Sequence, residues 1–131
     1  MNITKNFTLT ELTKTSTGLT NLPTKEQVAA LIKLCDKVLQ PARDLYGHPI
    51  RVNSGFRSIA VNRAVKGASK SQHLLGEAAD ITALSKEENK KLFEIIRDNL
   101  SFDQLINERD YSWIHVSYKS PESNRKQVLK L

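Results

Sequence analysis

Apolar residues recur every three or four positions over residues 25–47, which predicts one long amphipathic helix. A capping box formed by Thr24 and Gln27 starts this helix, and Gly47 is suited to end it. We expect Pro41 to kink or divide the helix, because proline has no amide hydrogen and its ring collides with the preceding turn. The predicted buried stripe consists of Val28, Leu31, Ile32, Cys35, Val38, Leu39 and Leu45.

Shorter patterned segments supply the remaining elements. Capping boxes at Thr8 and Ser85 predict two more helices, and Ser58 is suited to cap a third that runs to Val65. The inner side of the helix after Ser85 carries Leu92, Phe93, Ile95 and Ile96. Strand patterns cover residues 50–53, 78–82, 102–107 and 112–118. Because helices come first and short strands then mix with helices, we expect an α+β fold with residues 1–131 as a single domain.

The composition is that of a globular chain and excludes several classes. Of 131 residues, 39% are hydrophobic, and no apolar run approaches the ~18 residues of a membrane span, so we expect no membrane insertion. The one cysteine, Cys35, excludes a disulfide framework and fits the buried stripe. The net charge of +6 favours anionic partners, but no nucleic-acid motif accompanies it, and we expect no nucleic-acid binding.

Two of the three histidines lie in settings suited to chemistry. His73 lies in a glycine-turned loop, and Asp80 follows seven positions later on a strand of small residues. Strand alternation places the neighbours of His115 in the core and His115 itself on the opposite face. The third, His48, lies in a turn and has no expected function.

These three side chains form a donor set for Zn²⁺. A catalytic zinc site takes three protein ligands and keeps a fourth position open. The spacing of His73, Asp80 and His115 leaves two possibilities, a metal site or a hydrogen-bonded His–Asp pair at a sheet edge.

Two ordered motifs surround the donor set, and they read Ser71-x-His73-x-x-Gly76-x-Ala78-x-Asp80 and Trp113-x-His115. They resemble the motifs of the M15 family of zinc peptidases, which includes D-Ala-D-Ala carboxypeptidases and L-alanoyl-D-glutamate endopeptidases of phage lysins. Asn53–Ser58 is similar to the family's Ser-Gly-Tyr-Arg-Ser segment, and Phe102–Ile106 precedes the last ligand strand as in the family. Asn6–Leu12 resembles the start of small members from phages and prophages.

The resemblance implies a fold shared with the hedgehog signalling domain, an antiparallel sheet with helices packed on one side. It implies one Zn²⁺ per chain, with His73, Asp80 and His115 as ligands. It also implies that Arg57 binds the substrate carboxylate or the carbonyl that becomes an oxyanion, a task that suits a permanently charged group with paired donors. From the residues alone, a surface salt bridge is the alternative for Arg57.

Three residues near the ligands are candidates for substrate binding. Ser71 and Gln72 can orient His73, touch substrate or cap the loop. Trp113 shares a strand face with His115, where its side chain can line one side of the site, contact substrate or cover the edge of the core.

The general base departs from the family's usual patterns. Many members place a glutamate three residues before the last histidine ligand, where this chain has Ser112, and others place a histidine two residues before it, where this chain has Trp113. Glu108 resembles the glutamate of the hedgehog-type zinc site, and we assign it as the base. Asp110, in the same turn, ranks second, and the alternative for Glu108 is a polar hairpin residue.

The expected function is zinc-dependent hydrolysis of a peptide bond in the peptidoglycan stem peptide, by a monomer encoded by a phage or prophage. The alternative is a non-catalytic module that binds zinc or wall peptide, or a structural part of a virion. Because no apolar signal-peptide segment opens the sequence, we expect synthesis in the cytoplasm and access to the wall after phage-mediated release.

Overall fold

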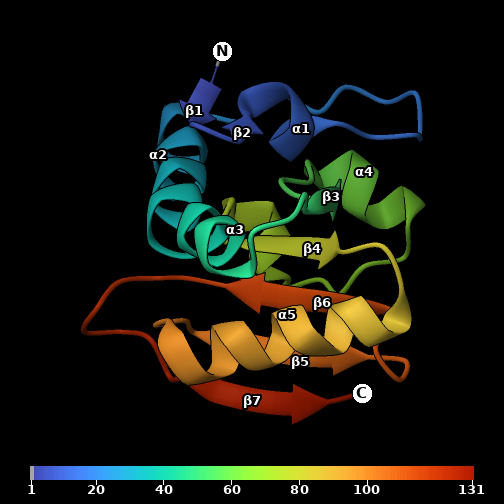
Figure 1. Ribbon diagram of the computed structural model, residues 1–131. Coiled ribbons are helices and arrows are strands. Elements are labelled where there is room, and N and C mark those ends of the chain that lie inside the picture. The colour runs from blue at the N-terminus through green and yellow to red at the C-terminus, as the bar shows by residue number, and fades with distance from the viewer. Residues whose placement is uncertain (1) are drawn as a thin grey trace.

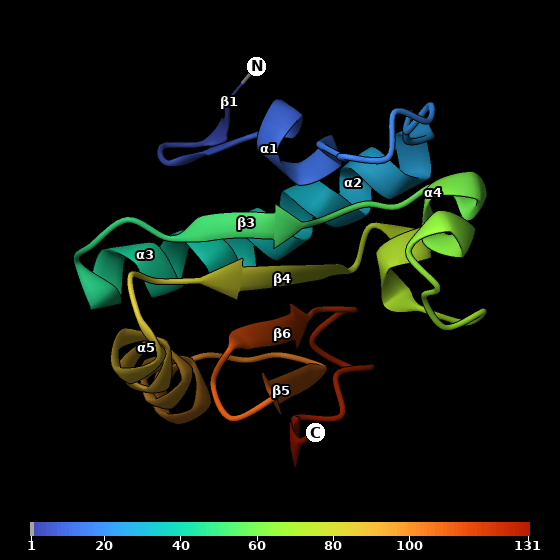
Figure 2. The same cartoon turned by 90° about the vertical axis from the view of Figure 1, so that its right-hand side faces the viewer.

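The computed structural model describes residues 2–131, and its centre is a five-stranded sheet with the order β3-β4-β6-β5-β7 (Figures 1 and 2). The strands are β3 (Arg51–Ser54), β4 (Ala78–Thr82), β5 (Gln104–Glu108), β6 (Trp113–Ser117) and β7 (Gln127–Lys130). A separate pair, β1 (Asn2–Thr4) and β2 (Phe7–Thr8), lies near the N-terminus. The predicted α+β class is confirmed.

The sheet is mixed, which corrects the expectation of a wholly antiparallel one. The pairs β3·β4, β4·β6 and β5·β6 are antiparallel, whereas β7 pairs with β5 in parallel. In the antiparallel β5·β6 pair, the end of β6 lies beside the start of β5. The loop of residues 118–126 crosses only that end of the sheet, so β7 starts where β5 starts and runs in the same direction.

The helices are α1 (Leu9–Thr13), α2 (Lys25–Leu34), α3 (Gln40–Tyr46), α4 (Ile59–Ala64) and α5 (Lys86–Asn99). A π-helical turn, η1 (Cys35–Leu39), joins α2 to α3, and a 3₁₀ turn, η2 (Gln72–Leu75), precedes β4. The capping boxes at Thr8 and Thr24 are both formed as predicted. Among residues 2–131, none of the helices has the length and apolar character needed to cross a membrane.

The long helix neither ends nor breaks at Pro41. It continues from Lys25 to Tyr46, and Gly47 ends it in the left-handed conformation at φ 80°. Pro41 lies in the first turn of α3, directly after the π-helical turn η1. The wider turn accommodates the ring and the missing amide hydrogen, because π turns already displace the regular hydrogen-bond ladder.

The buried stripe of this helix differs from the predicted one at three positions, because Val28 is only half-buried and two further residues are exposed. Ile32 and Leu45 are 44% and 55% exposed, while Leu34 and Ala42 are fully buried in their place. Ile32 lies beside the stripe because Leu31, not Ile32, begins the i, i+3, i+4 series that faces the sheet. Ala42 follows Val38 at i+4, whereas Leu45, further beyond the π turn, is rotated away from the core.

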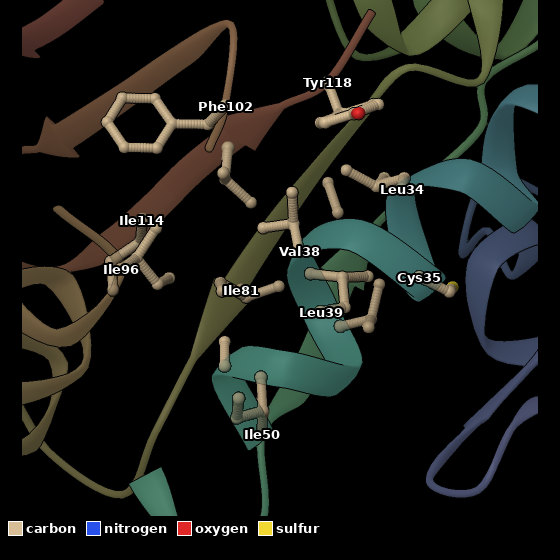
Figure 3. Packing of buried hydrophobic residues seen from close by; sticks show 14 of the residues in the cluster. Leu34, Cys35, Val38, Leu39, Ile50, Ile81, Ile96, Phe102, Ile114 and Tyr118 are labelled. Carbon is tan, nitrogen blue, oxygen red and sulfur yellow. The ribbon is translucent and has the colours of Figure 1, made fainter. Parts of the chain in front are cut away.

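The core lies between the helices and one face of the sheet (Figure 3). Val38 and Leu39 from η1 pack near Ile81 of β4, and Ile96 of α5 packs near Ile114 of β6. The expectation of Cys35 as a core residue is confirmed, and its burial raises the pKa of the thiol to about 12.

The core also determines where polar side chains of the central strands lie. In the β4·β6 pair, Ile81 is opposite Ile114, and Asp80 is opposite His115. Because side chains alternate between the faces of a strand, burial of the two isoleucines directs Asp80 and His115 to the other face.

Candidate metal centre

Three metal-ligating side chains meet on the face of the sheet opposite the core. His73 comes from η2, Asp80 from β4 and His115 from β6. The Nε2 atom of His73 lies 3.3 Å from Oδ1 of Asp80, and Nδ1 of His115 lies 3.0 Å from the same oxygen. One ligand atom from each residue lies within 4.8 Å of the others. The residues predicted to share a metal are therefore brought together.

Local sequence explains why these side chains converge. Register fixes Asp80 opposite His115, and the alanines before Asp80 are fully buried, so the sheet packs closely there. The η2 turn is capped by Ser71, whose Oγ accepts a hydrogen bond from the backbone N–H of His73. Gly76 ends the turn at φ 74° against the backbone of Gln27, where a side chain would collide.

A backbone contact fixes which nitrogen of His73 faces Asp80. Nδ1 of His73 lies 2.7 Å from the carbonyl oxygen of Gly55. A carbonyl only accepts hydrogen bonds, so Nδ1 carries the hydrogen and a neutral ring turns the lone pair of Nε2 toward the carboxylate of Asp80. Two electron-rich atoms face each other favourably only with a proton or a cation between them.

The donor set fits zinc in particular. Two histidine nitrogens and one carboxylate oxygen are ligands that Zn²⁺ takes in catalytic sites. Bonds of about 2.0–2.1 Å in a tetrahedral site place ligand atoms roughly 3.3 Å apart. The 3.3 Å and 3.0 Å separations at Oδ1 of Asp80 match this spacing, so the residues present fit the metal.

Asp80 is the electrostatic centre of the site. Its side chain is 15% exposed, and burial by itself raises the pKa of a carboxyl group. Hydrogen bonds and charge from His115 and His73 outweigh burial and hold the pKa of Asp80 well below its usual range. Oδ2 faces the Nη2 atom of Arg57 at 3.4 Å, so the carboxylate is in contact with a permanent cation.

Arg57 is held by three contacts within the protein. Its Nε donates to Oγ of Ser54, its Nη1 donates to Oδ1 of Asn62, and its Nη2 contacts Asp80. Its side chain is only 15% exposed, which differs from the surface salt bridge considered as an alternative. The structure therefore joins Arg57 to the metal site through Asp80.

The carbonyl of Gly55 gives a test of how the site is supported. A Cβ at position 55 would collide with the backbone of Leu12, so we expect Gly55→Ala to displace the carbonyl that holds His73. The expected result is a loss of about 1–3 kcal/mol in the free energy of unfolding, and zinc affinity about 10-fold weaker. Thermal unfolding and zinc titration measure the two effects.

Gly47→Ala is the matched control for this variant. Gly47 has φ 80°, a backbone conformation that strains alanine. Because there is open space where its Cβ would lie, alanine at position 47 does not collide with a neighbour. It should lower stability and leave zinc affinity unchanged. Wild-type zinc affinity in folded Gly55→Ala would remove the Gly55 carbonyl from the account.

A groove of about 350 Å³ runs along the sheet beside His115. Glu108, Ser71 and Gln72 line this groove together with His115, so four of the predicted site residues share one surface. The full lining is Ala68, Lys70, Ser71, Gln72, Gln104, Ile106, Glu108, His115 and Arg125. Arg57 instead lines a smaller depression of about 140 Å³.

The β5·β6 hairpin sets the positions of the two candidate bases. Ile106 is opposite His115 and Glu108 is opposite Trp113, so Glu108 lies on the face of His115, one diagonal step away. Asp110 is exposed at the tip of the turn with φ 54° and is not among the residues lining the groove.

Trp113 and Gln72 make contacts that the sequence motifs did not indicate. The guanidinium of Arg109 lies 5.5 Å from the ring centre of Trp113, so this ring is partly covered by its own hairpin. Trp113 is also not among the residues that line the groove beside His115. The other residue, Gln72, donates a hydrogen bond from Nε2 to Oε1 of Glu77 at 3.2 Å.

Sequence reasoning missed two sets of residues around the site. Asn62 is buried, accepts from Arg57 and donates to the carbonyl of Ala68, yet in the sequence it is an ordinary polar position in a short helix. Arg125 and Asp103 form an ion pair with Nη2 and Oδ2 2.7 Å apart beside the groove. The available signal was an acidic residue, Asp103, directly after Phe102 within a predicted strand, where a buried carboxylate needs a charged or hydrogen-bonding partner.

Comparison with known proteins agrees with this geometry. The chain matches the sequence model of the Peptidase M15 family over residues 5–117. A stretch of 49 residues is 51% identical to the zinc D-Ala-D-Ala carboxypeptidase of Streptomyces albus G. The matched stretch covers 37% of this chain and 19% of that enzyme, so it spans about a fifth of the relative's length. The chain belongs to the peptidase M15 family of zinc metallopeptidases.

Proposed function

We propose that this protein hydrolyses a peptide bond in the stem peptide of peptidoglycan, as a D-Ala-D-Ala carboxypeptidase or an L-Ala-D-Glu endopeptidase. The observation that carries the proposal is the meeting of His73, Asp80 and His115 beside a groove of about 350 Å³ that His115 lines. The name of the Streptomyces albus G relative, a zinc D-Ala-D-Ala carboxypeptidase, supports the D-Ala-D-Ala bond as the one that is cleaved.

His73 and His115 would hold zinc through Nε2 and Nδ1, and Asp80 through Oδ1. Zinc, when bound, supplies a Lewis acid that polarises a peptide carbonyl and makes water nucleophilic near neutral pH. The Gly55 carbonyl keeps His73 in the tautomer that presents Nε2, and Arg57 orients Asp80 through its contact with Oδ2.

Glu108 supplies the acid–base chemistry in this proposal. Its carboxylate lies in the groove on the face of His115, where it accepts the proton of the attacking water. The same oxygen returns that proton to the leaving amine nitrogen. The positive guanidinium of Arg57, fixed by Ser54 and Asn62, favours the negative charge that develops on the substrate carbonyl oxygen.

The arginine gives a prediction that separates geometry from charge. Arg57→Lys keeps a cation beside Asp80 but loses the fork that contacts Ser54 and Asn62. We expect kcat/KM to fall about 100-fold, the usual scale for losing one oriented donor, with zinc content unchanged. Steady-state kinetics on a defined stem peptide and metal analysis measure both.

Arg63→Lys is the matched control, because Arg63 is an exposed arginine on the neighbouring helix α4. It should retain wild-type kinetics. Equal turnover in wild type and in Arg57→Lys would take Arg57 out of the mechanism.

The second candidate function is a non-catalytic module that binds zinc and wall peptide, or a structural part of a virion. One specific observation favours it: Ser112 and Trp113 occupy the positions where many family members carry a base. Purified protein incubated with peptidoglycan and zinc distinguishes the two, because only a peptidase releases stem-peptide fragments.

The route to the wall and the state of assembly stay predictions from the sequence. We propose a monomer that a phage or prophage encodes and that reaches peptidoglycan after phage-mediated release. The net charge of +6 suits a polymer rich in carboxylates.

A further inference from the structure

The groove beside His115 has a basic end and an acidic end. Glu108 lies at one end of β5, and Gln104 and Arg125 lie at the other. Lys70 adds a second positive charge to the lining, and it is exposed. An extended peptide in this groove therefore meets opposite charges at its two ends.

Arg125 is held by several contacts with Asp103 although its side chain is 50% exposed. Asp103 beneath it is fully buried and accepts from Nε of Arg125 at 3.0 Å, from Nη2 at 2.7 Å and from the backbone N–H at 2.9 Å. The side-chain hydrogen bond from Arg125 lowers the pKa of Asp103 to about 2, so the aspartate is ionised near neutral pH. Arginine has five N–H donors, and these contacts leave those of Nη1 without a hydrogen-bond acceptor within residues 2–131.

Strand register gives the spacing between Arg125 and the metal ligands. Gln127 donates to the carbonyl of Asp103, which places Arg125 beside the start of β5. Ile106, opposite His115, is two residues further along than Gln104. Two strand residues span roughly 7 Å. The basic end is thus about two peptide units from His115.

We propose that Arg125, positioned by Asp103 and assisted by Lys70, binds a free carboxylate of the substrate about two residues from the bond that is cut. This proposal rests on the proposed function and adds to it a specificity-determining residue outside the segment matched to the family, which ends at residue 117. Arginine suits the task because its planar fork matches a carboxylate and remains charged. Glu108 repels a carboxylate at the other end, so the pair also fixes the direction of the bound peptide.

The test uses three versions of one synthetic stem pentapeptide that contains D-Glu and ends in D-Ala-D-Ala. One version has both the D-Glu α-carboxyl and the C-terminal carboxyl free, and each of the others has one of them amidated. In wild type, one amidation should raise KM about 10-fold or more, the scale of one charge-assisted hydrogen-bond pair, with a smaller change in kcat. The amidation that matters identifies which carboxylate Arg125 binds.

Arg125→Lys and Arg125→Gln should both lose this discrimination, since neither presents the fork. Arg125→Lys keeps a cation beside the buried Asp103, so it remains informative if the glutamine variant unfolds. Lys130→Gln is the matched control, because Lys130 is exposed on β7 but pairs with Asn107, whose side chain lies on the opposite face from Glu108. It should discriminate as wild type does.

Binding of the three peptides to Glu108→Gln is measured in parallel by calorimetry, so that the preference is also read without hydrolysis. Equal affinities for all three, or full discrimination retained in Arg125→Lys, would overturn the proposal. A wild type that cleaves none of the peptides, while Glu108→Gln still prefers the free carboxylate, contradicts the proposed function and leaves this inference supported.

Discussion

Zinc binding is expected to fall at least about 100-fold when His73, Asp80 or His115 is replaced by alanine. Each supplies one of three donor atoms that lie within 4.8 Å of one another. Loss of a residue that merely supports a ligand typically costs 10- to 100-fold in metal affinity, and loss of a ligand itself costs more. Metal analysis after gel filtration, with zinc competition against a chelating dye, measures the change.

His48→Ala is the control, because His48 is exposed in the loop that follows the C-terminal end of α3. It should bind one zinc as wild type does. Because the ligand nitrogens must be deprotonated, zinc should also dissociate as the solution is acidified. Stoichiometric, tight zinc in any of the three ligand variants would rule that residue out as a ligand.

Turnover is expected to fall about 10²- to 10⁴-fold in Glu108→Gln, the usual contribution of general acid–base catalysis. Glutamine keeps the shape of the side chain and some hydrogen bonding, but it does not take up a proton at neutral pH. Zinc content should be unchanged, because Glu108 is not one of the three residues that converge on the metal site. Kinetics and metal analysis on the same preparations measure both quantities.

Asp110→Asn is the matched control for the base. Asp110 is exposed at the tip of the turn and does not line the groove, so its substitution should change turnover much less. An inactive Asp110→Asn beside an active Glu108→Gln would move the base two residues along the chain.

The sequence predicted the site better than it predicted the details of the helices. Strand alternation and the ordered motifs were enough to bring His73, Asp80 and His115 together, because register is strongly constrained when one strand face is buried. The exposed position of Leu45 was not predictable from a regular 3.6-residue period, since the π turn at Cys35–Leu39 breaks that period. Ile32 precedes this turn, and it is exposed because it lies beside the regular series that begins at Leu31.

The parallel strand β7 and the contacts of Arg57 depend on tertiary structure. The segment after Ser117 is short and polar, so its pattern does not reveal on which side of β5 it pairs. Likewise, the side chain of Asn62 is held between Arg57 and the carbonyl of Ala68 in the loop before η2. Contacts of this kind depend on the paths of loops, and local patterns of polarity do not encode those paths.

Cleavage of a defined stem pentapeptide during zinc titration tests the central claim most directly. Metal-free protein should be inactive, and the rate should rise linearly to one zinc per chain and then level off. Mass spectrometry should show two products whose masses sum to that of the peptide plus one water. Full activity without metal, or no cleavage with one zinc bound per chain, would contradict the assignment of this protein as a zinc-dependent stem-peptide hydrolase.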